Sequence, residues 1–518
     1  MGHTDMGHKE QDVDGAPAGT REWLALALLA LPTLLIAMDL TALFLALPRL
    51  SSDLGASGAE QLWISDAYGF MVAGFVITMG TLGDRIGRRR LLLTGAAAFA
   101  AVSAVAAFAP DPRTLILARA LLGVAGATLT PSTLALITDI FRDERRRGKA
   151  IAIWATCQFT GGAFGPVLAG ILLQRFWWGS VFLVAVPVML LILAAGPVLL
   201  PEFRDRSAGR IDLVSVGLSL AAVLPMVYGL KQLTVADAHD KLTPLVAILA
   251  GGVLGGVFVR RQLTLAHPLL DLRLLRNRPL AAVLTALVFA GVAMAGTGLM
   301  VTQYLQSVLG YSPLASAVLF APMGLAVAAG TMIAPVLVRR MRPATAIASG
   351  LAVSAAGCLP LALAGGYPAV AVGITVLALG TGPLFALGTS LVVGSVPPER
   401  AGSAASMSET GNYLGGSLGL AVIGAIGASV YHARMDHAAG AAARTLAGAV
   451  AESGHLPPPQ ASALLHDAHA AFTTGLHVTG LIATAIFALL AVLVATSGRT
   501  GASPGVPAGE PEARHAFG

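Results

Sequence analysis

Four charged residues lie inside long apolar stretches of the chain: Asp39, Asp66, Arg119 and Glu409. A charged side chain in the centre of a membrane costs roughly 2.5 to 3.5 kcal/mol on insertion scales, so each of these residues needs a partner or a function. A carboxyl group shielded from water can hold a proton near neutral pH and release it when a cation approaches. The chemistry that these residues could carry is therefore proton exchange coupled to the binding of a cation.

Asp39 and Arg119 are predicted to meet inside the protein. Asp39 lies about nine residues before the end of the first apolar segment, roughly 13 Å along a helix, and Arg119 lies about six residues into the fourth segment from the same side. At similar depth the two charges can compensate each other. One interpretation is a purely structural salt bridge. The other is a carboxylate whose affinity for protons changes as Arg119 or a cationic substrate approaches and leaves.

Glu409 lies in a polar part of another apolar segment, among Ser406, Ser408, Thr410 and Asn412. This polarity indicates a helix face toward water, where Glu409 can exchange a proton for a cation. The alternative is a glutamate that only hydrogen-bonds to a neighbouring helix.

Asp66 lies about four residues from the outer end of the second segment, so it is either a binding residue or a solvated residue of an outer vestibule. Its aromatic neighbours Trp63 and Tyr68 are candidates for cation–π contacts with a substrate, or else anchors at the membrane interface. The side chains that we expect to line a substrate cavity are Trp63, Tyr68, Trp154, Gln158, Asn412 and Tyr413.

Two glycine-rich motifs are candidates for conformational roles. In GGAFGPVLAG (161–170), the glycines let helices approach closely and the proline kinks the helix, which suits a gate, although packing alone also explains glycines. In GTLGDRIGRRRL (80–91), small residues permit a tight turn, and the charges are expected to lock one half of the protein against helix ends of the other. The gating candidates are Gly80, Gly83, Asp84, Arg85, Gly87, Arg88, Gly161, Gly165, Pro166 and Gly170.

Membrane-spanning helices must position these residues. The chain has 56% apolar and 12% charged residues and a mean hydropathy of +0.77, far from the values of soluble proteins. Its apolar segments are roughly 20 residues long, enough to cross a hydrocarbon core as a helix. We predict about 14 spans, at 23–48, 61–82, 91–110, 113–138, 148–173, 179–200, 211–231, 243–259, 279–305, 313–338, 343–364, 368–393, 401–431 and 474–497.

The loops between these segments predict an orientation. If both termini are cytoplasmic, basic residues favour the inner loops over the outer ones by about three to one, as the positive-inside rule requires. The net charge of +6 comes from these loop arginines and not from a basic face, so nucleic-acid binding is not expected. The domain organisation that follows is a cytoplasmic tail (1–22), a six-helix bundle (23–200), two additional spans with linkers (201–278), a second six-helix bundle (279–497) with an outer loop (432–473), and a cytoplasmic tail (498–518).

Several other classes are not indicated by the sequence. It contains no H-E-x-x-H zinc pattern, no GxSxG elbow and no phosphate-binding loop, so we do not expect an enzyme. The two cysteines lie in separate apolar segments and imply no disulfide framework. The histidines of the outer loop lack an obvious further ligand set, so no metal and no cofactor are predicted.

The chain also repeats itself. When the segment GKAIAIWATCQFTGGAFGPVLAG (148–170) is shifted by about 254 residues, its glycines align with glycines of the thirteenth span. This predicts two parallel six-helix units separated by two extra spans, unless the abundance of glycine and alanine produces the match by chance. The aligned pairs include Gly161 with Gly415, Gly162 with Gly416, Gly165 with Gly419, and Gly170 with Gly424.

Together these motifs resemble those of the major facilitator superfamily, and within it the 14-span drug:proton antiporter family. The resemblance rests on GTLGDRIGRRR, LARALLGVAGATLTPS, GGAFGPVLAG and MDLTALFLALP, and it runs from about residue 23 to 497 in one register. It implies an all-α major facilitator fold of two six-helix bundles plus two extra helices. It also implies that acidic residues at Asp39, Asp66 and Glu409 bind substrate or protons, that Arg119 assists proton transfer, and that loop 432–473 forms an ordered helical cap.

The resemblance further implies a monomeric, proton-coupled efflux pump in a bacterial plasma membrane, with alternating access as its mechanism. Its substrates would be lipophilic, often cationic compounds such as quaternary ammonium compounds, dyes and antibiotics. An exporter dedicated to one native metabolite, antibiotic or lipid is an alternative. A proton-coupled importer is a further alternative, against which the Gly-Pro pair of the fifth span and the intramembrane acids argue.

Overall fold

The computed structural model describes residues 19–56, 58–203, 212–235, 242–265, 268, 270, 272–363, 365–396, 401–436, 438, 442–443 and 445–497. Within this part of the chain the regular structure is helical, and 13 helices are long and apolar enough to cross a membrane. A shorter apolar helix, Leu213–Gly229, accounts for the remaining predicted segment. The all-helical fold and the positions of the predicted spans are confirmed.

The first half of the chain forms α1 (Thr20–Leu54), α2 (Gly58–Ile86), α3 (Arg88–Ala107), α4 (Pro112–Ile140), α5 (Glu144–Arg175), α6 (Ser180–Leu183) and α7 (Ala185–Leu199). The intermediate part forms α8 (Leu213–Val235), α9 (Leu242–Thr264) and η1 (Leu272–Arg276). The second half forms α10 (Arg278–Gln303), η2 (Tyr304–Val308), α11 (Pro313–Leu337), α12 (Pro343–Leu363), α13 (Tyr367–Pro383), η3 (Leu384–Gly388), α14 (Thr389–Gly394), α15 (Ala401–Arg434), α16 (Leu446–Ser453) and α17 (Pro458–Ser497).

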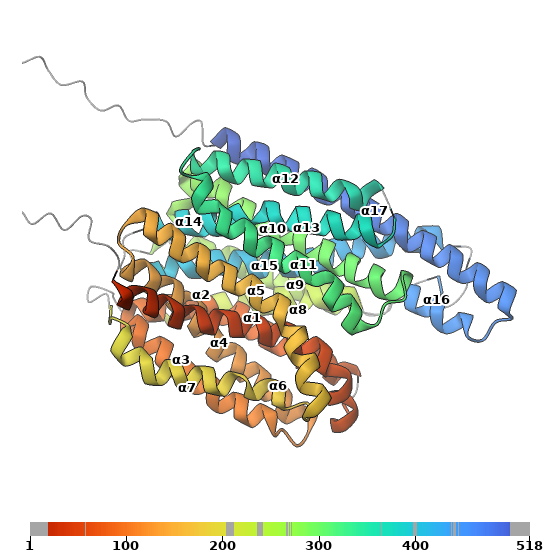
Figure 1. Cartoon of the computed structure of the whole chain (residues 1–518), viewed down its shortest axis with the longest axis horizontal. Helices are drawn as coiled ribbons and strands as arrows, with labels where there is room; N and C mark the ends of the chain where they lie inside the picture. The colour runs from red at the N-terminus through yellow and green to blue at the C-terminus, as the bar shows by residue number, and fades with distance from the viewer. Residues whose placement is uncertain are drawn as a thin grey trace, which may run out of the picture.

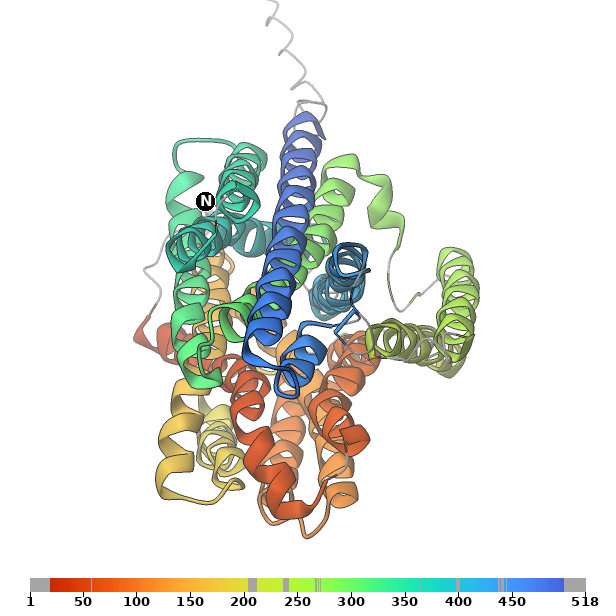
Figure 2. The same ribbon diagram turned by 90° about the vertical axis from the view of Figure 1, so that its right-hand side faces the viewer.

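These helices build two bundles that lie side by side, α1–α7 in one and α10–α17 in the other (Figure 1). The start of α1 and the end of α17 lie at the same end of the molecule (Figure 1). Each bundle has its own buried apolar cluster, and a few residues belong to the cluster of the other half. Val393, Ala401 and Ala405 pack with the first bundle, and Ala152 packs with the second. The helices α8 and α9 form a hairpin at one side of the molecule (Figure 2), where α8 packs against α2 and α15.

The loop between α15 and α17 is partly helical, as the family resemblance implies for residues 432–473. α16 packs against the start of α17, and the turn between them contains Leu456 and Pro457. Tyr431 Oη donates a hydrogen bond to the carbonyl of Ala442 (3.0 Å), and Glu452 accepts one from the amide of Ala442 (3.1 Å). α17 begins at Pro458, so the predicted span 474–497 is the later part of a longer helix whose first turns lie in this loop.

The predicted repeat is visible in the packing of glycines against neighbouring backbones. Gly161 and Gly165 of α5 touch the carbonyl oxygens of Leu34 and Met38 in α1. In the second half, Gly415 and Gly419 of α15 touch those of Val288 and Val292 in α10. Every residue of the second set follows its counterpart in the first by the same 254 positions. The two halves therefore share one helix-packing arrangement, and the agreement is not a chance alignment of common residues.

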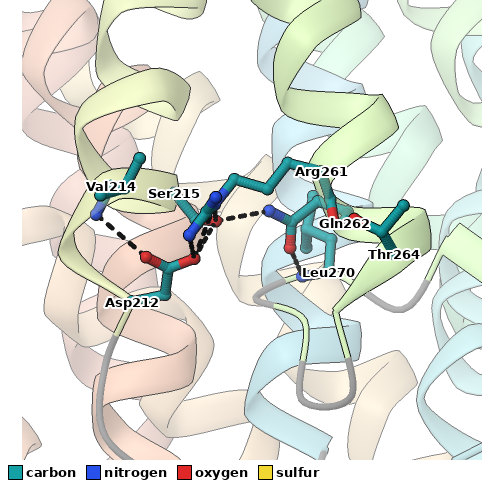
Figure 3. Close-up of polar contacts among 7 residues, drawn as sticks. All are labelled: Asp212, Val214, Ser215, Arg261, Gln262, Thr264 and Leu270. Atoms are coloured by element: carbon teal, nitrogen blue, oxygen red, sulfur yellow. Dashed lines mark hydrogen bonds and ion pairs between the residues drawn. The ribbon is translucent and has the colours of Figure 1, made fainter.

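A polar network closes one end of the α8–α9 hairpin (Figure 3). Asp212, which precedes α8, accepts hydrogen bonds from Ser215 Oγ (2.7 Å) and Arg261 Nε (2.9 Å), and Arg261 Nη2 lies 2.8 Å from the same carboxylate. Gln262 donates to Ser215 (2.9 Å) and accepts from the amide of Leu270 (3.4 Å). We call these five residues the Asp212 network. It ties the start of α8 to the end of α9 and to the linker that leads to α10.

The repeat generates a first prediction, on the glycines of α5. A Cβ on Gly165 would overlap the backbone of Met38, whereas one on Gly162 would lie 4.0 Å from the nearest atom, a methyl carbon of Thr41. We expect Gly165→Ala to destabilise the protein by about 1–3 kcal/mol, because α1 and α5 must separate, and Gly162→Ala to be neutral or slightly stabilising. The amount of monodisperse protein that survives heating in detergent measures the difference, and equal survival of the two variants would contradict the packing.

The Asp212 network generates a second prediction, on pH. Burial raises the pKa of Asp212, but the hydrogen bonds from Ser215 and Arg261 outweigh it and lower the pKa below its usual value. A carboxyl whose pKa is lowered by folding adds stability above its unfolded pKa, and this stability is lost as the pH falls through the folded value. Asp212→Asn should therefore lower the melting temperature at pH 7, and the difference from wild type should shrink below about pH 4.

The effect should be modest, about 1 kcal/mol or less, because both partners are partly exposed to solvent. Arg261→Gln should reproduce it, while Arg260→Gln, on the exposed residue next to the network, should not. A pH-independent difference between Asp212→Asn and wild type would show that the carboxylate charge does not hold the hairpin.

Candidate proton- and cation-binding site

The structure brings Asp39 and Arg119 together. Arg119 Nη1 lies 2.6 Å from Asp39 Oδ2, and the two residues are 0% and 9% exposed. Asp39 reaches across from α1, and Arg119 extends from α4, which begins at an Asp111 cap whose carboxylate accepts a hydrogen bond from the amide of Thr114 (3.0 Å). The predicted meeting of the two charges is thus confirmed, and it produces a buried ion pair inside the first bundle.

Arg119 is enclosed by several further groups. Its Nε donates to the carbonyl of Ile64 (3.2 Å), and its Cζ lies 4.8 Å from the centre of the Tyr68 ring and 6.0 Å from that of Phe182. Its Nη2 has no hydrogen-bond partner among the described residues, so the aromatic faces provide part of the stabilisation that this cation needs. The cation over the Tyr68 ring in this structure is therefore Arg119, where the sequence had suggested a substrate.

Glu409 is buried in the other half, in α15, with 2% of its surface exposed. The side chain of Asn412, one turn further along the helix, donates a hydrogen bond to it. The salt bridges found in the described part of the chain do not include Glu409. The two buried carboxylates therefore differ: Asp39 is compensated by an arginine, and Glu409 is accompanied only by neutral groups.

Tyr413 lies next to Glu409 on the same face of α15, because residues four apart align along a helix. It is half-buried and packs against the apolar cluster of the first bundle. The expectation that Tyr413 lines a substrate cavity stays a prediction.

Three other residues that were expected to line a substrate cavity are Trp154, Trp63 and Gln158. Trp154 is 2% exposed and donates its indole N–H to Thr133 (3.1 Å), so it is part of the first bundle's core. The polar atom of Trp154 thus has a partner in the core, and the expectation that Trp154 lines a cavity stays a prediction. Trp63 stacks on Tyr228 of α8, with ring centres 6.3 Å apart, and is 45% exposed. Gln158 is half-buried in α5.

Asp66 lies in α2, and its side chain is outside the described residues. Its assignment as a binding or vestibule residue therefore stays a prediction.

A small cavity adjoins Asp39 between α1, α5 and the start of α7. Apart from the carboxylate its lining is apolar and includes Ala42, Ala169 and Ala185. The volume within which the centre of a water molecule can lie is about 20 Å³. This volume is enough for one water molecule and too little for an organic substrate. A site for a larger cation at Asp39 therefore has to form by movement of the bundles.

The glycines of the fifth span serve mainly to bring α1 close to α5. Gly161 and Gly165 contact α1 on either side of Asp39 in the sequence, and Thr41 Oγ1 also lies against Gly165. Pro166 and Gly170 lie within the same continuous helix. This close approach fixes the depth of Asp39, and a gating role for the motif remains a prediction.

The charges of the GTLGDRIGRRRL motif have described partners in their own half. Arg88, 2% exposed, pairs with Asp84 (3.0 Å) and with Asp139 of α4. Arg89 lies 3.5 Å from Glu202, which follows α7. The expectation that the charges of this motif lock one half against the other stays a prediction. The turn directs α3 back along α2, so that the first residues of α3 face α4 and the end of α7.

Gly87 makes this turn, with a φ of +114° that side chains rarely adopt. Gly80 and Gly83 are buried in the last turns of α2, and Gly83 packs against Leu91 of α3. Arg85 belongs to the last turn of α2.

The described contacts between the halves include groups that sequence reasoning missed. The hydroxyl oxygens of Thr156 in α5 and Thr331 in α11 lie 2.6 Å apart. Phe159 of α5 and Phe385 of η3 have ring centres 4.9 Å apart. Thr331 could have been singled out as a polar residue inside an apolar span, but nothing in the sequence indicated that it pairs with Thr156. Among the described residues, no group of three or more His, Cys, Asp and Glu side chains could hold a metal ion.

Comparisons with known proteins bear on this arrangement. Residues 29–420 match the Major Facilitator Superfamily. The chain is 41% identical to the multidrug efflux pump LfrA of Mycolicibacterium smegmatis over 94% of its own length and 99% of the relative's. It is 35% identical to the methyl viologen resistance protein SmvA of Salmonella typhimurium, over 91% and 97% of the two chains. The solved structure of the human organic anion transporter MFSD10 (TETRAN) has the same fold, with a TM-score of 0.61, 15% identity, and coverage of 91% and 99%.

The ion pair generates the third prediction. Asp39→Asn and Arg119→Gln each leave one buried charge without its partner, which typically costs about 3–5 kcal/mol. The double variant leaves neither charge, so it should be more stable than either single variant. Melting temperatures in detergent, followed by tryptophan fluorescence at pH 7, test this order. A double variant as unstable as the sum of both single variants would mean that the two charges are independent.

Proposed function

The chain belongs to the major facilitator superfamily, and from this membership and its two unlike buried carboxylates we propose that it exports lipophilic, often cationic compounds in exchange for protons. Its similarity to an efflux pump and to a methyl viologen resistance protein along nearly the whole chain supports this choice. Methyl viologen is an organic dication, and acidic residues in an apolar surrounding suit such a ligand. Membership of a transporter family also makes transport, rather than catalysis, the proposed activity.

The observation that carries the proposal is the burial of Glu409 without a described cationic partner. A buried carboxyl group without such a partner costs less free energy as the neutral acid, and an arriving organic cation reverses this preference. Proton and substrate then bind alternately to one group. An antiporter requires such alternation, because the binding of one ligand to the carboxyl group must displace the other ligand from it.

Asp39 takes a second role in the same proposal. Its carboxylate is already neutralised by Arg119, so a proton or an organic cation that binds there must displace the guanidinium. Arg119 can remain over the aromatic faces of Tyr68 and Phe182 when this happens. When Arg119 returns to the carboxylate, it helps the proton to leave Asp39. The pair thus assists exchange, although the carboxylate of Asp39 is not an unoccupied site for a cation.

Export against a gradient requires energy, and the membrane supplies enough. One pH unit provides about 1.4 kcal/mol per proton, and each 100 mV adds about 2.3 kcal/mol per charge moved. The two bundles would rock about the space between them, so that the carboxylates face one side and then the other.

We further infer an orientation and a location. The start of α1 and the end of α17 share one end of the molecule (Figure 1), and this arrangement, together with the excess of basic residues in the loops assigned to that end, supports a cytoplasmic position for both termini. Bacterial relatives support the plasma membrane as the site of action. A monomer suffices, because both carboxylates belong to one chain.

The fourth prediction concerns proton exchange. Adding ethidium to acid-loaded inverted vesicles that contain the protein should release protons from the lumen. Asp39→Asn and Glu409→Gln should reduce this flux at least tenfold, because a neutral amide can neither carry the proton nor attract the cation. A pH-sensitive dye in the lumen reports the flux.

Asp111→Asn is the matched control. It removes one carboxylate at the start of α4, where an asparagine caps a helix as well as an aspartate does. We expect its flux to equal that of wild type. Undiminished flux in both Asp39→Asn and Glu409→Gln would refute the assignment of the two carboxylates, and wild-type vesicles without flux would refute proton-coupled export of ethidium.

A further inference from the structure

Two contacts between the bundles lie on the same faces of α5 and α11. Near the middle of the two helices Ala163 meets Gly324, where a Cβ on the glycine would lie 2.8 Å from the Cβ of Ala163. Seven residues away on each helix, the hydroxyl oxygens of Thr156 and Thr331 lie 2.6 Å apart. Seven residues make about two helical turns, so the two contacts share one face of each helix and lie roughly 10 Å apart. The seam between α5 and α11 thus has a glycine contact near its middle and a hydroxyl contact nearer one end.

The hydroxyl contact lies toward the end of the molecule where α1 starts, which is proposed above to be cytoplasmic. Because successive long helices alternate in direction, α5 begins and α11 ends at this end. The hydroxyl contact lies before the glycine contact in α5 and after it in α11. On the same side of the glycine contact, Phe159 packs on Phe385, and the buried Ala152 belongs to the apolar cluster of the second bundle. The structure therefore shows this end of the seam closed.

Each hydroxyl of the pair also lies within reach of a carbonyl of its own helix. Thr156 Oγ1 lies 2.7 Å from the carbonyl of Ala152, and Thr331 Oγ1 lies 2.7 Å from that of Ala328. A hydroxyl has one hydrogen to donate, so in the closed seam one threonine donates to the other, which donates to its carbonyl. When the helices separate, each threonine can donate within its own helix, and no buried hydroxyl loses its partner. The contact can therefore break and form again at a small cost in free energy.

A rotation of the bundles about the glycine contact is enough to break the hydroxyl contact. Ala163 and Gly324 have the two smallest side chains, so the helix backbones approach closely there. A rotation of about 15°, an amplitude known for rigid-body movements, shifts a group 10 Å from the axis by roughly 3 Å. Added to the present separation of 2.6 Å, this shift takes the two hydroxyls beyond hydrogen-bond distance.

We propose that Thr156 and Thr331 form a hydroxyl latch, which holds the cytoplasmic end of the α5–α11 seam closed, and that the contact of Ala163 with Gly324 is the axis about which this end opens. The inference rests on the proposed export by rocking bundles, and it adds which contacts of the seam break and which persist. It makes Thr156 and Thr331 positioning residues, since they act on the conformation and not on the substrate.

The latch belongs to one of two seams that the repeat makes equivalent. The 254-residue shift relates the α5–α11 seam to the seam between α2 and α15. It places Ile77 of α2 at the position of Thr331, and Ile77 is buried in an apolar cluster. The α2–α15 seam therefore cannot form this hydroxyl pair, and α8 packs against both of its helices instead.

A cross-link tests whether the latch opens during export. The pair Thr156→Cys/Thr331→Cys is made in a background without the native cysteines, Cys157→Ala/Cys358→Ala. Ethidium uptake into acid-loaded inverted vesicles is measured before and after oxidation with copper phenanthroline. We expect the pair to cross-link, the uptake to fall at least tenfold because the seam cannot open, and dithiothreitol to restore it.

Ser215→Cys/Gln262→Cys is the matched control, because these side chains also form a hydrogen bond (2.9 Å) but join α8 to α9 within one hairpin. Its cross-link should change the uptake by less than about twofold. A latch pair that does not cross-link, or one that is fully cross-linked and still takes up ethidium, would overturn the latch while the proposed export stands. Wild-type vesicles without proton-driven ethidium uptake would overturn the proposed function and the latch together.

A second measurement reports the opening of the seam without a cross-link. Ala328 is 5% exposed, and it lies on the seam face of α11 because it is four residues from Gly324 and three from Thr331. In the cysteine-free background, the thiol of Ala328→Cys should react with N-ethylmaleimide when the seam opens. Thr156→Val keeps the shape of the side chain without the hydroxyl, so it should raise the labelling rate about threefold or more.

Thr156→Ser should restore slow labelling, because it returns the hydroxyl. Thr484→Val is the control, since it makes the same substitution at a hydroxyl that donates within α17 to the carbonyl of Gly480 (2.9 Å), and it should leave the labelling rate unchanged. Equal labelling rates with threonine and valine at position 156 would overturn the latch. A serine variant that labels as fast as the valine variant would do the same, because the effect would then come from packing and not from the hydroxyl.

Discussion

The ion pair between Asp39 and Arg119 constrains how α1 and α4 pack in the first bundle. Neither charge can leave the other without a large cost, because both are buried in a part of the protein surrounded by apolar side chains. On the opposite side of α1, Gly161 and Gly165 bring α5 into direct backbone contact. α1 is thus held between α4 and α5, and the carboxylate of Asp39 keeps its depth when the bundle moves as a unit.

The two bundles share this packing but not their charges. The 254-residue shift that superposes the glycine contacts places Ala293 at the position of Asp39, and Ala155 at that of Glu409. Both alanines are buried. Each bundle therefore carries one carboxylate where the other carries a methyl group. The duplication gives the two halves a common frame, and in the proposed mechanism their unequal charges give them different tasks, with a compensated acid in one and an uncompensated acid in the other.

Much of this arrangement could be predicted from the sequence, because apolar length and cost of charge burial are local properties. The helices at the fourteen predicted spans and the meeting of Asp39 with Arg119 follow from segment lengths and depths, whereas the helical part of loop 432–473 followed from the family resemblance. The partners of Arg88 and Arg89 did not follow, because a basic turn can face any neighbouring helix end. The core position of Trp154 and the pairing of Thr156 with Thr331 depend on helix rotation, which segments apolar on all sides do not reveal. The Asp212 network was missed for a related reason, since its members are separated by a whole hairpin.

Proton release on substrate binding tests the exchange at the buried carboxylates most directly. The purified protein is mixed with ethidium in weakly buffered detergent solution near pH 7, and a pH indicator counts the protons released per ethidium bound. Wild type should release protons on binding, and the Asp39→Asn/Glu409→Gln double variant should release none while the Asp111→Asn protein behaves as wild type. Ethidium binding to wild type without proton release, or undiminished release from the double variant, would contradict the exchange of a proton for a cation at these two residues.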